Sequence, residues 1–283
     1  MRLVGKEINF QKKLTIIPIG DVHLGSKASD LKHLNRTIKR ILDTPDCYTI
    51  MMGDICDLIT LNDKRRFDPE EQVFRSLSGI AQQQRDLAIK TFQPLADRGL
   101  ILGYADGNHE EYYKKHAEFD VSKDIVNTFN GKKKEEDKGY IHYLGYCFFY
   151  NLILSKGKNN TIKTLTIWGH HGKGGGTVGG SVNKITQQPQ NFIADIFLMG
   201  HDHNKFNIPR TQIGVTQCLK PSMYEKHIRL VRTGSFLKSY QQDATTYSER
   251  ALYAPSELAS PVIEIDIRHS GASPNTFEIK VTD

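Results

Sequence analysis

Short apolar runs recur along this chain, and five of them stop at polar loops. Their β-branched and aromatic composition predicts buried strands. Because the strand ends of an open α/β sheet line up along the edge where ligands bind, we expect the five loops to lie close together. The five runs cover residues 14–19, 47–52, 100–104, 161–168 and 193–199.

Segments with apolar residues at helical spacing lie between several of these runs. Residues 31–42 predict one helix, and residues 70–97 read as mostly helical, with Val73 in the core stripe and Pro94 as a kink. A further helix is expected after the third run, ending at Phe129. Additional strands are predicted at residues 140–154, 227–233, 261–267 and 276–281.

The composition is that of an enzyme-sized globular protein. The chain has 283 residues, of which 38% are hydrophobic and 25% charged. We expect one domain over residues 1–283, with a motif core at about 14–236 and a C-terminal loop and strands at 237–283. The net charge of +6 would attract phosphate-bearing partners if the basic residues share a face. Lysines scattered for solubility are the alternative.

The cysteines indicate neither a zinc clip nor a disulfide scaffold, because all four are far apart in sequence. A reducing cytoplasm is therefore the expected location. Charges within the first ten residues argue against a signal peptide there, and the longest apolar run, residues 147–154, is too short to cross a bilayer. No membrane association is expected.

Histidine and aspartate are concentrated in the loops that follow the predicted strands. A lone histidine is more often structural than a ligand, but six of the eleven histidines gather here beside carboxylates. Imidazole and carboxylate ligands without a thiolate are typical of catalytic Mn²⁺, Fe or Zn²⁺. The residues are His23, His109, His170, His171, His201 and His203, with Asp21, Asp54, Asp57 and Asn108.

The order of these motifs resembles the calcineurin-like metallophosphoesterase superfamily. The five blocks are Asp21-Val-His23, Gly53-Asp54-Ile-Cys-Asp57, Gly107-Asn108-His109-Glu110, His171-Gly172 and Gly200-His201-Asp-His203. Each block is weak alone, whereas five in order are specific. The resemblance implies an α/β fold in which a two-sheet β-sandwich is flanked by helices, α-β-β-α, with a dinuclear metal site at one edge.

The resemblance also implies which residues would bind each of the two metals. Asp21, His23 and His203 would hold the first metal, and Asn108, His171 and His201 the second. Asp54 would bridge the two through both of its carboxylate oxygens. The cofactors would be two divalent cations, with manganese favoured over iron or zinc. A hydroxide between them would attack the phosphate ester.

Two further residues receive catalytic roles from the same resemblance. His109 would stabilise the phosphoryl oxygens or protonate the leaving oxygen, and Asn108 and His109 would both contact substrate. Asp57 would accept a hydrogen bond from the other nitrogen of His109 and fix its tautomer. The alternative for Asp57 is a helix N-cap.

The fourth block leaves two histidines open, because His170 and His171 are adjacent and point to opposite faces of a strand. We favour His171, which directly precedes the small residue Gly172. The glycine-rich residues 173–180 are either a flap beside the metals or a mobile surface loop.

One departure from the family pattern narrows the range of possible substrates. Leu58 stands where the serine/threonine protein phosphatase branch has an arginine, which argues against that branch. Arg65 or Arg66 could replace that phosphate contact. Aromatic residues with nearby lysines could form a surface for single-stranded nucleic acid, or simply pack; they are Tyr112, Tyr113, Tyr240, Tyr247 and Tyr253.

The functional hypothesis is therefore a metal-dependent phosphoesterase that hydrolyses a phosphomonoester or a phosphodiester. The basic charge balance favours DNA or RNA among the substrates. The alternative is a catalytically silent scaffold of the same fold, which has no physical need for a bridging carboxylate. No protein partner can be inferred from the sequence.

Overall fold

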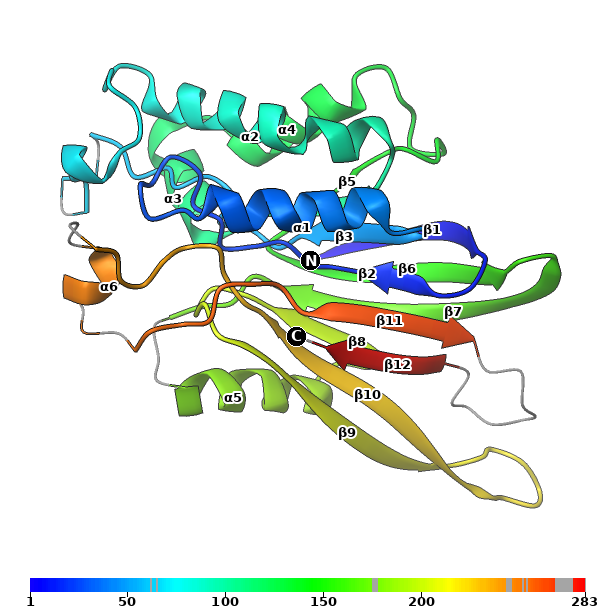
Figure 1. Cartoon of the computed structure of the whole chain (residues 1–283). Coiled ribbons are helices and arrows are strands. Elements are labelled where there is room, and N and C mark those ends of the chain that lie inside the picture. Colours follow the sequence, from blue (N-terminus) through cyan, green and yellow to red (C-terminus); the bar gives the residue numbers. More distant parts are fainter. Residues whose placement is uncertain are drawn as a thin grey trace.

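Two six-stranded sheets lie face to face between outer helices (Figure 1). The computed structural model describes residues 1–61, 63–64, 66–174, 178–242, 246–250, 252, 254–267 and 277–282. The predicted fold class, an α/β two-sheet sandwich flanked by helices, is confirmed. It is the α-β-β-α arrangement that the motif resemblance implies.

One sheet is built around four parallel strands. Its order is β12-β11-β2-β3-β4-β5, with β2 to β5 parallel and β11 antiparallel to β2. Parallel strands carry their carboxyl ends at the same edge. The bounds are β2 Leu14–Ile16, β3 Cys47–Met51, β4 Ile101–Ala105, β5 His142–Gly145, β11 Val262–Ile267 and β12 Phe277–Thr282.

The other sheet has the order β1-β6-β7-β8-β10-β9. Strands β7 and β8 are parallel, and β9 and β10 form a long antiparallel hairpin. The bounds are β1 Arg2–Phe10, β6 Cys147–Lys156, β7 Asn159–His170, β8 Ile196–Met199, β9 Lys205–Val215 and β10 Met223–Thr233.

The helices cover the outer faces of the two sheets. In Figure 1, α1, α2 and α4 lie over the sheet that contains β3, and α5 lies under the sheet that contains β10. Helix α3 and the short helices η1, η2 and α6 lie in the connections. The bounds are α1 Leu31–Asp43, η1 Pro69–Glu71, α2 Ile80–Asp97, α3 Asn108–Ala117, α4 Val121–Asn130, α5 Val178–Gln187, η2 Gln188–Gln190 and α6 Tyr247–Arg250.

Three apolar layers hold the architecture together. The largest joins one sheet to the upper helices and includes Leu34 and Phe92, both fully buried. The second fills the space between the sheets, and the third joins Trp168 and Phe197 to Ile185 of α5. Burial of apolar side chains on both faces of each sheet fixes the direction in which its strand ends point.

The local sequence explains how α1 begins and which face it buries. The side chain of Asp30 accepts a hydrogen bond from the backbone N–H of His33 at 2.9 Å, which caps the first turn. Leu34, Ile38 and Ile41, at spacings of four and three residues, are the buried face. The helix predicted for residues 31–42 is confirmed.

The prediction of a mostly helical segment over residues 70–97 is only partly right. The helix begins at Ile80, after Gly79 in the left-handed region (φ +63°). Upstream, the backbone N–H of Lys27 donates to the carbonyl of Glu71, and Val73 is 44% exposed rather than in the core. These residues pair with the loop after β2, and that pairing overrides helical periodicity.

Two other segments predicted as single elements are each divided. The helix expected to end at Phe129 is two helices, α3 and α4, separated by Glu118 in the left-handed region (φ +55°). The strand expected over residues 140–154 is β5 and β6, which belong to different sheets. Gly145, with φ +63°, is the last residue of β5, where the chain begins to pass from one sheet to the other.

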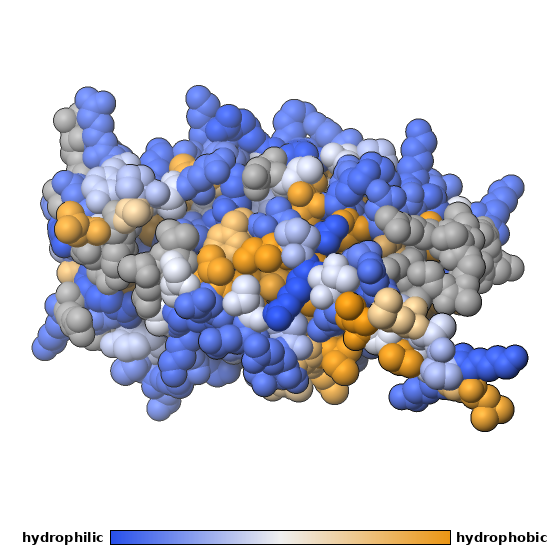
Figure 2. Space-filling view, turned by 90° about the horizontal axis from the view of Figure 1, so that it is seen from below, coloured by the Kyte–Doolittle hydropathy of each residue, from blue (hydrophilic) through white to orange (hydrophobic). Residues whose placement is uncertain are grey.

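The sequence pattern missed β1 and β9, the two edge strands of their sheet. An edge strand has fewer buried positions, so its hydrophobic alternation is weak. The β9–β10 hairpin extends from the body, and Figure 2 shows hydrophobic residues at this protruding end. Its exposed apolar side chains are Ile213, Val215, Leu219 and Met223.

Candidate metal centre

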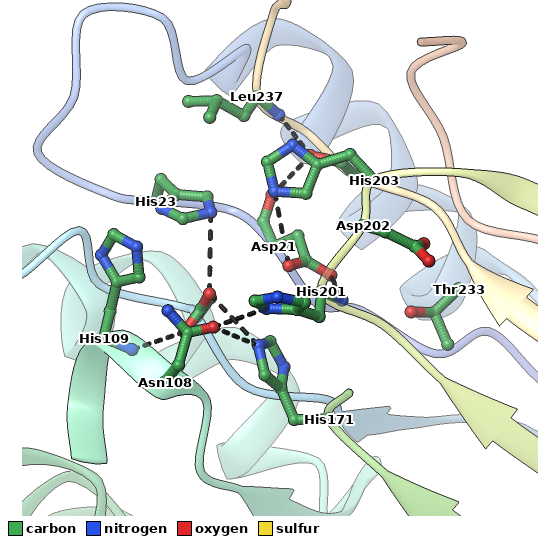
Figure 3. Close-up of polar contacts among 12 residues, drawn as sticks. Asp21, His23, Asn108, His109, His171, His201, Asp202, His203, Thr233 and Leu237 are labelled. Carbon is green, nitrogen blue, oxygen red and sulfur yellow. Dashed lines mark hydrogen bonds and ion pairs between the residues drawn. The ribbon is translucent and has the colours of Figure 1, made fainter. Parts of the chain in front are cut away.

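The loops that follow β2, β3, β4, β7 and β8 meet at one edge, as the strand pattern predicts (Figure 3). Hydrogen bonds across the two sheets show this directly. The backbone N–H of His201 donates to Asp21 Oδ2 at 2.9 Å, and His171 Nδ1 donates to the Met52 carbonyl at 2.8 Å. The candidate site therefore takes residues from both sheets.

Close approach of two of these loops depends on glycine. A Cβ on Gly107 would lie 2.0 Å from Asp54 Oδ1, and a Cβ on Gly53 would lie 2.5 Å from the backbone nitrogen of Gly107. Only glycine permits such contacts without moving the backbone. The glycine in each block thus brings Asp54 beside Asn108.

One cluster contains the three residues assigned to a first metal. Asp21, His23 and His203 each place a ligand atom within 4.8 Å of the others. His203 Nε2 is 3.5 Å from Asp21 Oδ1, and the rings of His23 and His203 are 5.3 Å apart. The side chains of Asp21 and His23 are almost completely buried.

A second cluster contains Asp54, His171 and His201, again within 4.8 Å. Asn108 lies among them, because its Oδ1 is 2.6 Å from His201 Nδ1 and 3.1 Å from His171 Nε2. Two imidazole nitrogens and an amide oxygen therefore converge on the same space. These are the residues assigned to a second metal.

Asp54 lies between the clusters, although its two oxygens are not used as the sequence predicts. A single oxygen, Oδ2, faces both clusters, 3.2 Å from His171 Nε2 and 4.0 Å from His23 Nε2. The other oxygen, Oδ1, accepts the backbone N–H of His109 at 2.9 Å. The expectation that each oxygen faces one metal is corrected, because the first turn of α3 engages Oδ1.

His109 joins His23 and Asp54 in a third, overlapping group of potential ligand atoms. Its Nδ1 donates a short hydrogen bond to the backbone carbonyl of Asp57. The prediction that the Asp57 carboxylate accepts this bond is therefore wrong. The carboxylate instead lies with Oδ1 3.4 Å from His23 Nδ1, because its side chain turns toward the first cluster.

The two adjacent histidines of the fourth block have different environments. His171 is fully buried, and its ring faces Asp54 and His201. His170 stacks on Trp168, with ring centroids 5.9 Å apart, and its Nδ1 accepts the backbone N–H of Gly172. Of the two, only His171 turns its ring into the cluster.

Backbone strain is concentrated at these positions. Non-glycine residues in the left-handed region cost roughly 1–2 kcal/mol each. Such strain persists where the surrounding structure compensates for it, often at functional sites. Half of the ten described residues of this kind belong to the proposed ligand set: Asp21, His23, Asp54, His201 and His203.

The donor set fits divalent cations. Asp21 Oδ1 and His23 Nε2 are buried without a hydrogen-bond partner among the described residues, while His23 Nδ1 lies 3.4 Å from Asp57 Oδ1. Buried polar atoms are normally satisfied, so unsatisfied acceptors that converge on one space indicate an ion. Imidazole nitrogens with carboxylate and amide oxygens suit Mn²⁺, Fe or Zn²⁺.

The charges of the site favour cation binding as well. Burial raises the pKa of Asp21 to about 6, and the neighbouring Asp54 carboxylate also raises it. Burial lowers the pKa of His171, but Asp54 more than compensates and raises it to about 10. Burial also lowers the pKa of His201 to about 4. Without metal, His171 therefore neutralises carboxylate charge that a cation would neutralise instead.

Glu110, which the sequence presents only as part of a motif, connects the loop after β3 to the loop after β4. Its Oε2 accepts the backbone N–H groups of Asp54 and Gly107, each at 2.9 Å. Its Oε1 accepts those of Ile55 and Cys56, at 2.8 and 3.2 Å. Burial raises the pKa of Glu110 to about 8, whereas these donors stabilise its charged form. The signal available in the sequence was its place three residues after Gly107.

Two buried glutamines, also missed, support Asp57. Gln72 Nε2 donates to Asp57 Oδ2 at 3.5 Å, and Gln84 Nε2 donates to Gln72 Oε1 at 3.2 Å. Gln84 Oε1 accepts the backbone N–H of Leu58 at 2.6 Å. No local pattern marks these residues, because Gln84 reaches the site through tertiary packing of α2 and Gln72 through packing of the segment that follows η1.

A cavity of about 1590 Å³ opens beside both clusters. His23, Asp54, Asn108 and His109 line it, and so do Lys27, Arg66 and Lys173 from other segments. Residues 173 and 174 of the glycine-rich stretch border the cavity, and helix α5 begins at Val178. Residues 175–177 lie outside the described residues, so the choice between a flap and a surface loop stays open.

The residues predicted to contact phosphate or nucleic acid do not all line the cavity. Arg66 lies on the cavity wall, its Nε donates to Asp63 Oδ2 at 2.6 Å, and its guanidinium is 5.0 Å from the centroid of the Tyr112 ring. Tyr112 also stacks on His116, and Tyr113 packs against the core. Arg65, Tyr253 and the Tyr247 side chain lie outside the described residues.

No family model matches the chain, and no curated protein matches it. Among solved structures it is similar to Vps29 of Chaetomium thermophilum, at 10% identity over 95% of each chain with a TM-score of 0.33. It is also similar to Plasmodium GAP50, described as the anchor in the inner membrane complex, at 12% identity over 96% of this chain and 84% of that one (TM-score 0.41). A conserved Streptococcus pneumoniae protein described as a predicted phosphoesterase is 13% identical over 95% of this chain and 98% of that one (TM-score 0.28).

None of the described helices is both long enough and apolar enough to cross a membrane.

Proposed function

We propose that this protein is a dinuclear metal-dependent phosphoesterase. The observation that carries the proposal is the position of Asp54, whose Oδ2 faces His23 of one cluster and His171 of the other. A carboxylate shared by two clusters of potential metal ligands would hold two cations close enough for two-metal hydrolysis. The five ordered sequence blocks support the same conclusion.

Residues of each cluster would hold one cation. Asp21, His23 and His203 would bind the first, and Asn108, His171 and His201 the second, with Asp54 shared. When bound, the two cations supply a water of lowered pKa and polarise the phosphoryl oxygens. The Met52 carbonyl accepts the Nδ1 proton of His171, which leaves Nε2 free to bind a metal.

His109 is the residue that we assign to proton transfer. The Asp57 carbonyl can only accept a hydrogen bond, so Nδ1 of His109 carries a proton and Nε2 is the nitrogen that titrates. Burial lowers the pKa of His109, and the carboxylate of Asp54 opposes that effect. In its charged form, His109 would donate from Nε2 to the leaving oxygen.

The cavity favours a phosphodiester with substituents on both sides, such as DNA or RNA. Its volume of about 1590 Å³ exceeds the roughly 300–1,000 Å³ typical of small-molecule sites. The basic side chains on its wall, beside the carboxylates of Asp68, Glu70 and Glu71, would attract phosphates beyond the one being cleaved; they are Lys27, Arg66, Lys173, Lys238 and Arg250. We propose Arg66 as a phosphate contact, because its guanidinium lies over Tyr112, one helical turn after Asn108 and His109.

Hydrolysis assays with Mn²⁺ test this function. Turnover of p-nitrophenyl phosphate, its bis ester and labelled single-stranded DNA would be compared with and without EDTA. We expect metal-dependent cleavage that is faster for the diesters, and its loss in Asp54→Asn and His109→Ala. Absence of metal-dependent turnover on all three substrates would contradict the proposal. Faster cleavage of the monoester would overturn the diester preference alone.

A further inference from the structure

Arg232, in β10, is a buried charge to which the sequence assigned no role. Its side chain is 1% exposed, and among the largest fully buried side chains only Trp168 is larger. Burial lowers the pKa of Arg232 to about 10, so the guanidinium stays charged at neutral pH. A charge removed from water must be compensated by protein groups.

Two elements supply that compensation. Arg232 Nη2 forms an ion pair with Oδ2 of Asp202, whose side chain is 4% exposed. Arg232 Nε donates to the hydroxyl of Ser181 at 2.9 Å, and Ser181 is fully buried in the first turn of α5. One side chain thus connects β10, the loop after β8 and the helix that follows the glycine-rich segment.

Asp202 is the residue between two of the proposed ligands. His201 and His203 on either side are both in the left-handed region, with φ of 80° and 58°. Figure 3 shows the Asp202 side chain pointing away from the rings of His201 and His203. Its carboxylate, with a side chain only 4% exposed, therefore lies on the side of the strained loop opposite the two rings.

The two rings serve different clusters. His201 Nδ1 lies 2.6 Å from Asn108 Oδ1, whereas His203 Nε2 lies 3.5 Å from Asp21 Oδ1. A loop with two strained residues so close together relaxes unless something fixes it. The contact between Asp202 and Arg232 lies at its midpoint.

We propose that Arg232 is a positioning residue that acts through Asp202. It holds His201 and His203 at the separation that lets each serve one metal. The inference rests on the proposed two-metal function and adds a determinant outside the ligand set. Through Ser181 the same guanidinium also holds α5, where Lys184 Nζ donates to the carbonyls of Lys173 and Gly174 beside the cavity.

Arginine is needed for this role because its N–H groups diverge in a fixed plane. Nε reaches Ser181 while Nη2 reaches Asp202. The ammonium of a lysine has its donors on one atom and cannot span both partners with the same geometry. Arg232→Lys should therefore keep the charge but not the position of the loop.

The test compares Arg232→Met, Arg232→Lys and Asp202→Asn with a matched control. Arg229→Met is that control, because Arg229 lies in the same strand and donates from Nε to the carbonyl of Ile279 at 3.0 Å, away from the loop. Backbone amide spectra of residues 200–204 in EDTA report loop position without metal. Mn²⁺ titration by calorimetry reports affinity, and circular dichroism reports folding.

We expect the amides of residues 200–204 to shift in the Arg232 and Asp202 variants but not in Arg229→Met. We also expect about a 10- to 100-fold loss of Mn²⁺ affinity, the usual effect of removing a residue that orients a ligand. Unshifted amides, or an affinity within about twofold of the parent, would overturn the inference.

Two other experimental outcomes would also distinguish the positioning role from the proposed function. If Arg232→Met does not fold, Asp202→Asn, which keeps the shape of the side chain, provides the answer by the same two measurements. If the parent protein itself binds no metal, the proposed function fails. The amide spectra in EDTA still support or overturn the positioning of His201 and His203.

Discussion

Oδ2 of Asp54 lies 3.2 Å from Nε2 of His171, and the other nitrogen of that imidazole donates to the Met52 carbonyl. The contact has two consequences. Without metal it is an ion pair that raises the pKa of His171 to about 10. With metal, the proton on Nε2 must leave before the nitrogen can bind.

Metal binding should therefore release a proton. From about pH 6.5 to 8.5, where His171 is charged in the metal-free protein, we expect Mn²⁺ affinity to rise about tenfold per pH unit. Calorimetry in PIPES and Tris would measure release of about one proton. The dependence of Mn²⁺ affinity on pH should become weaker in His171→Asn. An unchanged dependence in that variant would show that the released proton comes from another residue.

The same pKa shift predicts how the metal-free fold responds to pH. The folded pKa of His171, about 10, lies above its ordinary value of 6.5. The ion pair between charged His171 and Asp54 therefore stabilises the metal-free fold fully below pH 6.5. That stabilisation is lost as the pH rises through 10. In EDTA, the melting temperature should fall over this range more steeply for the parent than for His171→Asn. Parallel curves would contradict the prediction.

Neighbouring histidines provide a matched pair of variants. His171→Ala should abolish binding of one of two Mn²⁺ ions, because it removes a nitrogen from the second cluster. His170→Ala should retain both, because that ring stacks on Trp168 and points away from Asp54. Equilibrium dialysis with metal analysis counts the ions. Two bound ions in His171→Ala would show that the ligand assignment is wrong.

Glu110→Gln should destabilise the fold. Each carboxylate oxygen accepts two backbone N–H groups, so either orientation of the amide places its NH₂ against donors. We expect the free energy of unfolding in EDTA to fall by about 2–3 kcal/mol. Chemical denaturation measures it, with Glu111→Gln as control because Glu111 is exposed and pairs with Lys115. Equal stability of the two variants would contradict this role.

Asp57→Asn tests whether the carboxylate serves His23 rather than His109. Oδ1 of Asp57 lies near His23 Nδ1, so the variant should weaken the first metal about 10- to 100-fold. The pH dependence of kcat, which depends on His109, should keep its position because the Asp57 carbonyl is unchanged. A shifted pH profile with unaltered metal binding would instead show that the carboxylate serves His109.

Arg66→Gln should raise KM for a diester with a smaller effect on kcat, because Arg66 lines the cavity outside the metal clusters. Removing a bidentate hydrogen-bonding partner of a phosphate costs about 2 kcal/mol, or about 30-fold in kcat/KM. Steady-state kinetics on the bis ester measures it. The control is Arg98→Gln, whose guanidinium binds the Leu42 carbonyl. Equal kinetics for the two variants would exclude the contact.

Much of the fold followed from the sequence, and the failures have physical causes. Buried central strands such as β3 and β4 are recognisable because burial on both faces leaves continuous apolar runs. Edge strands β1 and β9 have no such signature. Residues 70–79 do not join the predicted helix, because Glu71 and Val73 pair with Lys27 and Gly25 instead.

For the candidate site, the residues that gather can be predicted from the strand pattern, since a ligand after each strand end must reach the same edge. The group that each ligand atom faces depends on how the two sheets and the helices pack. Asp54 presents one oxygen to both clusters because α3 engages the other, and Asp57 turns its carboxylate to His23 and its carbonyl to His109. Arg232, Gln72 and Gln84 carry no local signal. Their contacts arise only when β10, the segment after η1 and α2 pack against the loops, because hydrogen bonds between distant segments depend on the three-dimensional arrangement and not on spacing along the chain.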